Sequence, residues 1–146
     1  MSDKDFIPAA LKLAQTSTQS VEHDAARKLL AFDGEVYPRD GCAITLSTLL
    51  AEAGMDVPAT YQALALGNVL KKRGWKVIPV GQQQTGDVGS TCRDTPHHGD
   101  DHIYFVLQAL NHDEMVIADN QASSPHFRWA SGQGGKTPTR FFLRAV

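Results

Sequence analysis

The sequence predicts an α+β fold, with helices first and an antiparallel sheet after them. Three observations favour this class. Apolar residues recur with helical spacing up to about residue 73, the period becomes strand-like after Gly74, and no βαβ alternation is present. Apolar residues make up 42% of the 146 residues and charged residues 21%, which is typical of a globular chain. We therefore expect a single domain over 1–146, with a helical part at about 1–33 and a core at about 35–146.

The first half of the chain is expected to form four helices. The apolar stripes of the first two are Ile7, Leu11 and Ala14, and then Val21, Ala25, Leu29 and Phe32. Gly and Pro in 33–41 predict a loop. The third helix is expected from Cys42 to about Ala53, because Gly54 suits a helix C-terminus. The fourth is expected to begin at Pro58 and to end at Arg73.

The second half is expected to form the sheet. Strands are predicted at 75–80, around Val88, and at 102–107, 115–118 and 140–146. The turn residues Asn111 to Asp113 make 102–107 and 115–118 the two arms of a hairpin. Residues 123–138 are rich in Ser, Gly and polar side chains, so we predict a loop there.

Three placements in this order indicate thiol chemistry. Cys42 occupies the first turn of a helix, where unpaired N–H groups favour a thiolate. His102 stands at the head of the strongest strand, and Asp119, Asn120 and Gln121 end the neighbouring strand. A nucleophile, a base and a residue that orients the base are what thiol-dependent acyl transfer requires.

Hairpin register decides which polar residue orients the imidazole. A three-residue turn at 111–113 pairs His102 with Ala122 and brings Asn120 diagonally onto its face. A two- or four-residue turn pairs His102 with Ser123 and offers Gln121 instead, with Asp119 on that same face. From the residues alone, all three remain candidates.

These segments resemble the papain-like bacterial cell-wall cysteine peptidases of the NlpC and CHAP types. The resemblance covers about residues 35–122. It is carried by Asp40-Gly41-Cys42, by Thr85-Gly86-Asp87-Val88 with Asp101-His102-Ile103-Tyr104-Phe105-Val106, and by Met115-Val116-Ile117-Ala118-Asp119-Asn120. Gly41 stands where the NlpC type usually has Asp, and Ala43 replaces the usual small hydroxyl residue. The resemblance implies a central helix packed on an antiparallel sheet, and amide hydrolysis in peptidoglycan without metal or cofactor.

The expected mechanism gives each residue a role. Cys42 attacks the amide carbonyl, and His102 carries the proton to the leaving amine. The resemblance favours Asp119 as the orienting residue, with Asn120 second. The Cys42 N–H donates to the oxyanion, with Tyr37 or the loop up to Gly41 as the second donor. Trp129 is a candidate for substrate contact.

Two other classes of function are weighed beside the hydrolase. One is a binding or immunity-type module that keeps the fold without the activity. The other is a zinc or harder-cation site, with Cys92 as a further candidate ligand. Its candidate ligands lie at His97, His98, Asp100, Asp101 and His102.

Charge and hydropathy exclude several partners. The net charge is −2, which does not suit nucleic acid, and no run of 18 apolar residues predicts a membrane span. The start of the chain lacks the features of a Sec signal. We therefore expect a protein that stays in the producer's cytoplasm or leaves by a non-Sec route or phage lysis. A protein that leaves in this way could be a delivered antibacterial effector or a phage lysis protein. A protein inhibitor or immunity protein is then a candidate partner.

Overall fold

The computed structural model describes residues 2–16, 21, 24–25, 27–28, 41–97, 101–120 and 124–146. Its helices are η1 (Asp3–Phe6), α1 (Ile7–Thr16), α3 (Cys42–Glu52) and α4 (Ala63–Lys72). Its strands are β1 (Lys76–Ile78), β2 (Val88–Ser90), β3 (Ile103–Ala109), β4 (Glu114–Ala118), β5 (His126–Trp129) and β6 (Phe141–Arg144). These helices all precede the strands, so the predicted α+β class is confirmed.

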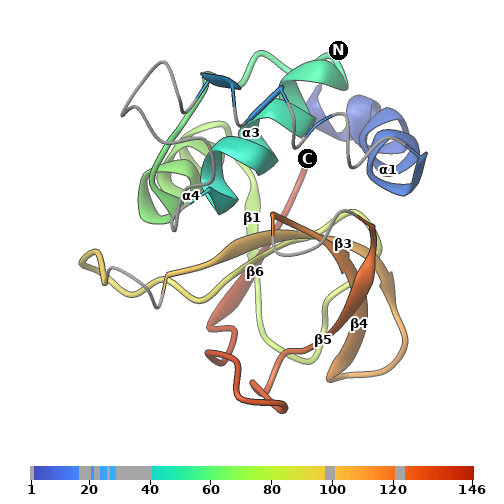
Figure 1. Ribbon diagram of the computed structural model, residues 1–146, viewed down its shortest axis with the longest axis vertical. Helices are drawn as coiled ribbons and strands as arrows, with labels where there is room; N and C mark the ends of the chain where they lie inside the picture. Colours follow the sequence, from blue (N-terminus) through green and yellow to red (C-terminus); the bar gives the residue numbers. More distant parts are fainter. Residues whose placement is uncertain are drawn as a thin grey trace.

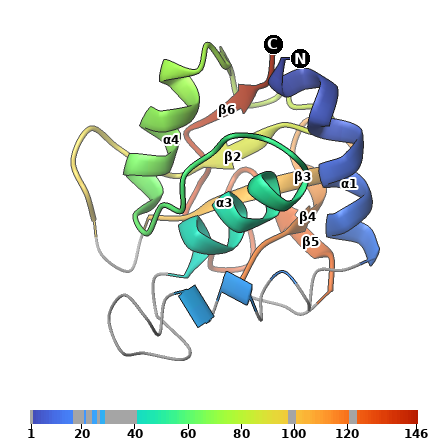
Figure 2. The same cartoon turned by 90° about the horizontal axis from the view of Figure 1, so that it is seen from above.

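The six strands form one antiparallel sheet in the order β1-β6-β2-β3-β4-β5. Strands β2 to β5 follow the chain, whereas β6 returns and inserts between β1 and β2. The helices form a layer on one face of the sheet (Figure 1). Seen from the helix side, α3 crosses the middle strands, with α4 and α1 on either side of it (Figure 2).

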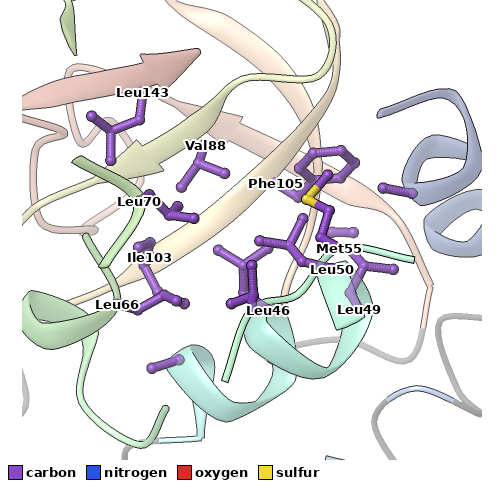
Figure 3. Packing of buried hydrophobic residues seen from close by; sticks show 14 of the residues in the cluster. Leu46, Leu49, Leu50, Met55, Leu66, Leu70, Val88, Ile103, Phe105 and Leu143 are labelled. Atoms are coloured by element: carbon purple, nitrogen blue, oxygen red, sulfur yellow. The ribbon is translucent and has the colours of Figure 1, made fainter. Parts of the chain in front are cut away.

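Helix α3 is the buried centre of this arrangement. Every residue from Cys42 to Leu50 is buried, because the sheet lies beneath the helix and other parts of the chain surround it. Its side chains join residues of β2, β3, α4 and β6 in the main core (Figure 3); among these are Leu46, Leu49, Leu50, Leu66, Leu70, Val88, Ile103, Phe105 and Leu143. The helix ends at Glu52 with Ala53 as its C-cap, and Gly54 follows with a φ of 111°, as expected of a glycine at a helix C-terminus.

Strand β3 is apolar along most of its length because both of its faces are buried. Ile103, Phe105 and Leu107 belong to the core under the helices, whereas Tyr104 and Val106 belong to a second cluster on the opposite face. The segment between β5 and β6 is tied to this second cluster. There the Tyr104 hydroxyl lies 2.6 Å from the Thr139 hydroxyl in a hydrogen bond.

Two expected elements differ from the structure. Helix α4 begins at Ala63 and not at Pro58. The preceding residues pass alongside α3, where the Thr60 N–H donates to Ser47 Oγ at 3.1 Å. Strand β5 lies inside the predicted loop 123–138 and pairs with β4.

Some of the remaining sequence predictions can be compared with the structure, whereas others fall on residues that it does not describe. Val21 and Ala25 are buried, as expected of the second helix. Leu29, Phe32, Tyr37 and the rest of 29–40 lie outside the described residues, as do 98–100 and Gln121. None of the described helices has the length and apolar character needed to cross a membrane.

Candidate active site

Cys42 is the first residue of α3, and Gly41 precedes it as the N-cap. The side chain is 5% exposed and belongs to the main core. The backbone N–H groups of Ile103 and Ala43 lie close enough to the sulfur to favour its thiolate form. The Ile103 contact places the thiol against the first peptide of β3, immediately after His102. Two distant parts of the sequence therefore meet at this sulfur.

Burial dominates the electrostatics of the thiol. It raises the pKa of Cys42 to about 12, because a thiolate at this position loses its hydration. The N–H groups of Ile103 and Ala43 act in the opposite direction, whereas the charges of Cys92 and Asp119 raise the pKa further. A helix N-terminus alone would favour the thiolate, and this outcome differs because desolvation outweighs it. The resting group is the protonated thiol.

His102 is held firmly by its own backbone and by its ring. Its backbone N–H donates to Thr91 Oγ1 at 2.8 Å, and its carbonyl accepts from the Thr91 N–H at 3.0 Å. The imidazole stacks on Tyr104, with ring centroids 5.9 Å apart. Nε2 lies 2.7 Å from Asp119 Oδ2 in a hydrogen bond. Nδ1 is therefore the ring nitrogen that this hydrogen bond leaves unengaged.

A β-bulge brings Asp119 to His102. Near the turn, Ala109 pairs with Met115, which is the register of a three-residue turn. The register shifts between Val106 and Gln108, and Phe105 then pairs with Ala118. Continued along the strands, the shifted register puts Asp119 diagonally opposite His102. The three-residue turn therefore does not lead to the pairing of His102 with Ala122 that turn length alone would give, because the bulge shifts the register before His102.

Asn120 and Trp129 are not joined to His102. Asn120 Oδ1 is buried and makes no hydrogen bond with any residue that the structure describes. Trp129 pairs with Glu114, at the far end of β4 from Asp119. A substrate contact by Trp129 near Cys42 is therefore not supported by its place in the sheet.

His126 was missed by the sequence analysis. Its Nε2 lies 2.7 Å from Asp119 Oδ1, so one carboxylate joins two imidazoles. Burial acts to raise the pKa of Asp119, but the hydrogen bonds to His102 and His126 outweigh it and hold that pKa well below its usual range. The hydrogen bond to Asp119 raises the pKa of His126. His126 could have been found only by recognising β5, because the pairing of β5 with β4 places His126 opposite Ile117.

In the segment 97–102, which the sequence offers as a metal site, the described residues make other contacts. The His97 N–H donates to Asp101 Oδ2 at 2.8 Å, while His102 is directed to Asp119. Across the described residues, no group of three or more His, Cys, Asp or Glu side chains is arranged to hold a metal ion. His98 and Asp100 lie outside those residues.

Taken together, the geometry gives a buried thiol, an imidazole with one engaged nitrogen, and an ionised carboxylate behind it. The hydrogen bond to the carboxylate fixes the orientation of the imidazole, and the backbone N–H of Ile103, the residue after His102, lies close to the thiol. A search for related proteins found no family model, no curated protein and no solved structure that matches this chain.

Proposed function

We propose that this protein is a cysteine-dependent amide hydrolase with Cys42 as nucleophile, His102 as general base and acid, and Asp119 as the orienting residue. The observation that supports it most is the hydrogen bond from His102 Nε2 to the buried Asp119, next to the peptide that contacts the Cys42 sulfur. The proposal includes a papain-like arrangement, in which the helix bearing the thiol packs on the strand bearing the histidine.

The reaction would begin with a neutral pair, because the thiol is protonated at rest. Cys42 Sγ attacks the carbonyl carbon while its proton passes to His102 Nδ1. His102 then protonates the leaving amine, and the C–N bond breaks to give a thioester. Water adds to the thioester, His102 takes its proton, and the thiol is regenerated with release of a carboxylic acid. One amide and one water give one amine and one acid.

The proposed substrate is peptidoglycan, on the resemblance to NlpC- and CHAP-type peptidases. The biological setting proposed with it is a delivered antibacterial effector or a phage lysis protein, with an inhibitor or immunity partner. The oxyanion would accept from the backbone N–H of Cys42 at the start of α3.

Digestion of purified peptidoglycan tests the proposal. New amino groups and the masses of the soluble fragments would be measured for the wild-type protein and for Cys42→Ser. We expect Cys42→Ser to lower the rate by at least about a thousandfold, because the alcohol is a far weaker nucleophile in this setting. Cys92→Ser is the matched control, since Cys92 is also a buried free thiol. Equal rates for wild type and Cys42→Ser would refute the assignment.

A second candidate function is a binding module that uses the same fold without cutting. The specific observation in its favour is that Cys42 is only 5% exposed and that burial raises its pKa to about 12. Co-sedimentation with peptidoglycan distinguishes the two functions. A wild-type protein that sediments with the polymer and releases no amino groups supports the binding module.

A further inference from the structure

A pocket of about 370 Å³ lies between α4 and the ends of β2 and β6, on the Cys92 side of the molecule. Three basic side chains line it, Lys71, Arg93 and Arg140, against a single acidic one, Asp94. The chain as a whole has a net charge of −2. Positive charge is therefore gathered here although the protein is weakly acidic.

Among the residues that the structure describes, the two arginines of the pocket have no carboxylate partner. Elsewhere, Arg73 and Arg144 each form a two-pronged pair with an aspartate, at 2.6–2.9 Å. By contrast, neither Arg93 nor Arg140 has a side-chain hydrogen bond or ion pair with any described residue. Guanidinium groups that remain unpaired beside a hollow are suited to a carboxylate or phosphate, whose oxygens match their planar donors.

The remaining cation is held in place by an aromatic ring. Lys71 Nζ lies 4.4 Å from the centroid of the Phe141 ring, in a cation–π contact. Phe141 and Leu64 also line the pocket and give it an apolar wall. The pocket thus combines a cationic rim with a surface suited to the carbon part of a ligand.

Gly67 keeps the helix side of the pocket open. It lies in the middle of α4, where glycine is about 1 kcal/mol less favourable than alanine. A Cβ built on Gly67 meets nothing within 4 Å, so no neighbour requires the missing side chain. The unfilled space belongs to the pocket that Gly67 lines.

We propose that this pocket binds a small organic anion or phosphate, with its oxyanion held by Arg93 and Arg140 and its remainder against Phe141. The volume falls at the small end of ligand pockets, which begin at about 300 Å³. The site stands apart from the proposed hydrolysis, because Cys42, His102 and Asp119 do not line it. Cys92 is close to both regions, because it lines the pocket and also contributes to the raised pKa of Cys42.

Calorimetric titration of the full chain tests this site with three probes: succinate, inorganic phosphate and the uncharged succinamide. The Cys42→Ser protein is used, so that hydrolysis at the proposed active site does not contribute to the measured heat. We expect succinate or phosphate to bind and succinamide not to bind. Arg93→Gln and Arg140→Gln should each weaken binding by about tenfold or more, because each removes charge-assisted hydrogen bonds. Whichever anion binds more tightly identifies the source of the oxyanion.

Two further variants test whether binding takes place in this pocket. Gly67→Leu places a side chain in the pocket without meeting a neighbour at Cβ, and it should abolish binding while the protein stays folded. Lys76→Gln removes a positive charge from β1, outside the pocket, and should leave binding unchanged. Equal binding of succinamide, no binding of either anion, or an equal loss with Lys76→Gln would each overturn the proposal.

Discussion

Cys42 and Cys92 are both buried free thiols, yet their surroundings differ. Cys42 lies at the start of α3 against β3, in reach of the charge of Asp119. Cys92 follows β2 and lines a pocket with three basic side chains. Burial is the first cause of a raised pKa at both; at Cys92, Ser90 and Lys71 act to lower the pKa, whereas Asp101 acts to raise it. Burial alone therefore does not determine the pKa of each thiol, because the neighbouring groups also raise or lower it.

The largest effect is expected from Asp119→Ala, which removes the carboxylate shared by His102 and His126. Hydrolysis should fall by about 10⁴-fold, because the imidazole loses its orientation. The free energy of unfolding should fall by about 3 kcal/mol, because a buried charged partner is lost. Peptidoglycan digestion and urea unfolding measure the two effects. Asp113→Ala is the control, since Asp113 bonds Ser131 at the opposite end of β4. Wild-type stability of Asp119→Ala would contradict the buried-partner role.

The next-largest effect is expected at alkaline pH, where the free energy of unfolding should depend more on Cys42 than on Cys92. The pKa of Cys42 rises from 9.0 to about 12 in the folded state, so the unfolded chain loses the thiol proton first. Stability is thus full below about pH 9 and falls by about 1.4 kcal/mol per pH unit above it. Urea unfolding from pH 8 upward should show a flatter decline for Cys42→Ser than for wild type.

Cys92→Ser should flatten that alkaline decline less, because Lys71 and a hydrogen bond from Ser90 oppose the effect of burial on Cys92. Tyr104 remains as a common background, since burial raises its pKa to about 12. A larger change for Cys92→Ser than for Cys42→Ser would reverse the comparison.

A smaller effect is expected from His126→Gln. The pKa of His126 is raised by Asp119, so the pair stabilises the protein fully below the ordinary value of 6.5 and ceases to do so as pH rises through the folded value. We expect a loss of about 1 kcal/mol at acidic pH and little change at alkaline pH. Urea unfolding at about pH 5.5 and about pH 8.5 measures the difference. An equal loss at both pH values would mean that the ion pair is not the cause.

The smallest effect on stability is expected at Gly67, which lines the same pocket as Cys92. Gly67→Ala should stabilise the protein by about 0.5–1 kcal/mol, because alanine favours the helix and its Cβ enters open space. Gly89→Ala is the opposite case, since its Cβ would collide with the Tyr104 ring. Urea midpoints compare the two variants. Destabilisation by Gly67→Ala would show that the space is not free.

Elements with local signals were predicted well from the sequence. Helix α3 begins at the expected Cys42 and is followed by Gly54, and the β3–β4 hairpin lies where the turn residues place it. These features depend on nearby residues alone. The placement of Asp119 beside His102 also depends on the bulge in β3, which the turn residues do not predict.

Strand β5 was missed because its polarity is inverted. Phe127 is 58% exposed, whereas Arg128 is 3% exposed, with its guanidinium 5.1 Å from the centroid of the Tyr104 ring. An edge strand that buries a cation and exposes a phenyl ring has no recognisable alternation. His126 was missed with it. The early start expected for α4 has a similar origin, because Ser47 holds Thr60 through a contact that local propensity does not reveal.

The insertion of β6 between β1 and β2 determines when the sheet can form. Residues 76–78 find their partner only at 142–144, and residues 88–90 need 141–143 as well as β3. A nascent chain that has not yet emerged past residue 144 therefore exposes two unpaired strand edges. Such distant pairing is slow to close and vulnerable to association while it waits. Until residue 144 has emerged from the exit tunnel the sheet stays incomplete, so the native topology favours folding after that point.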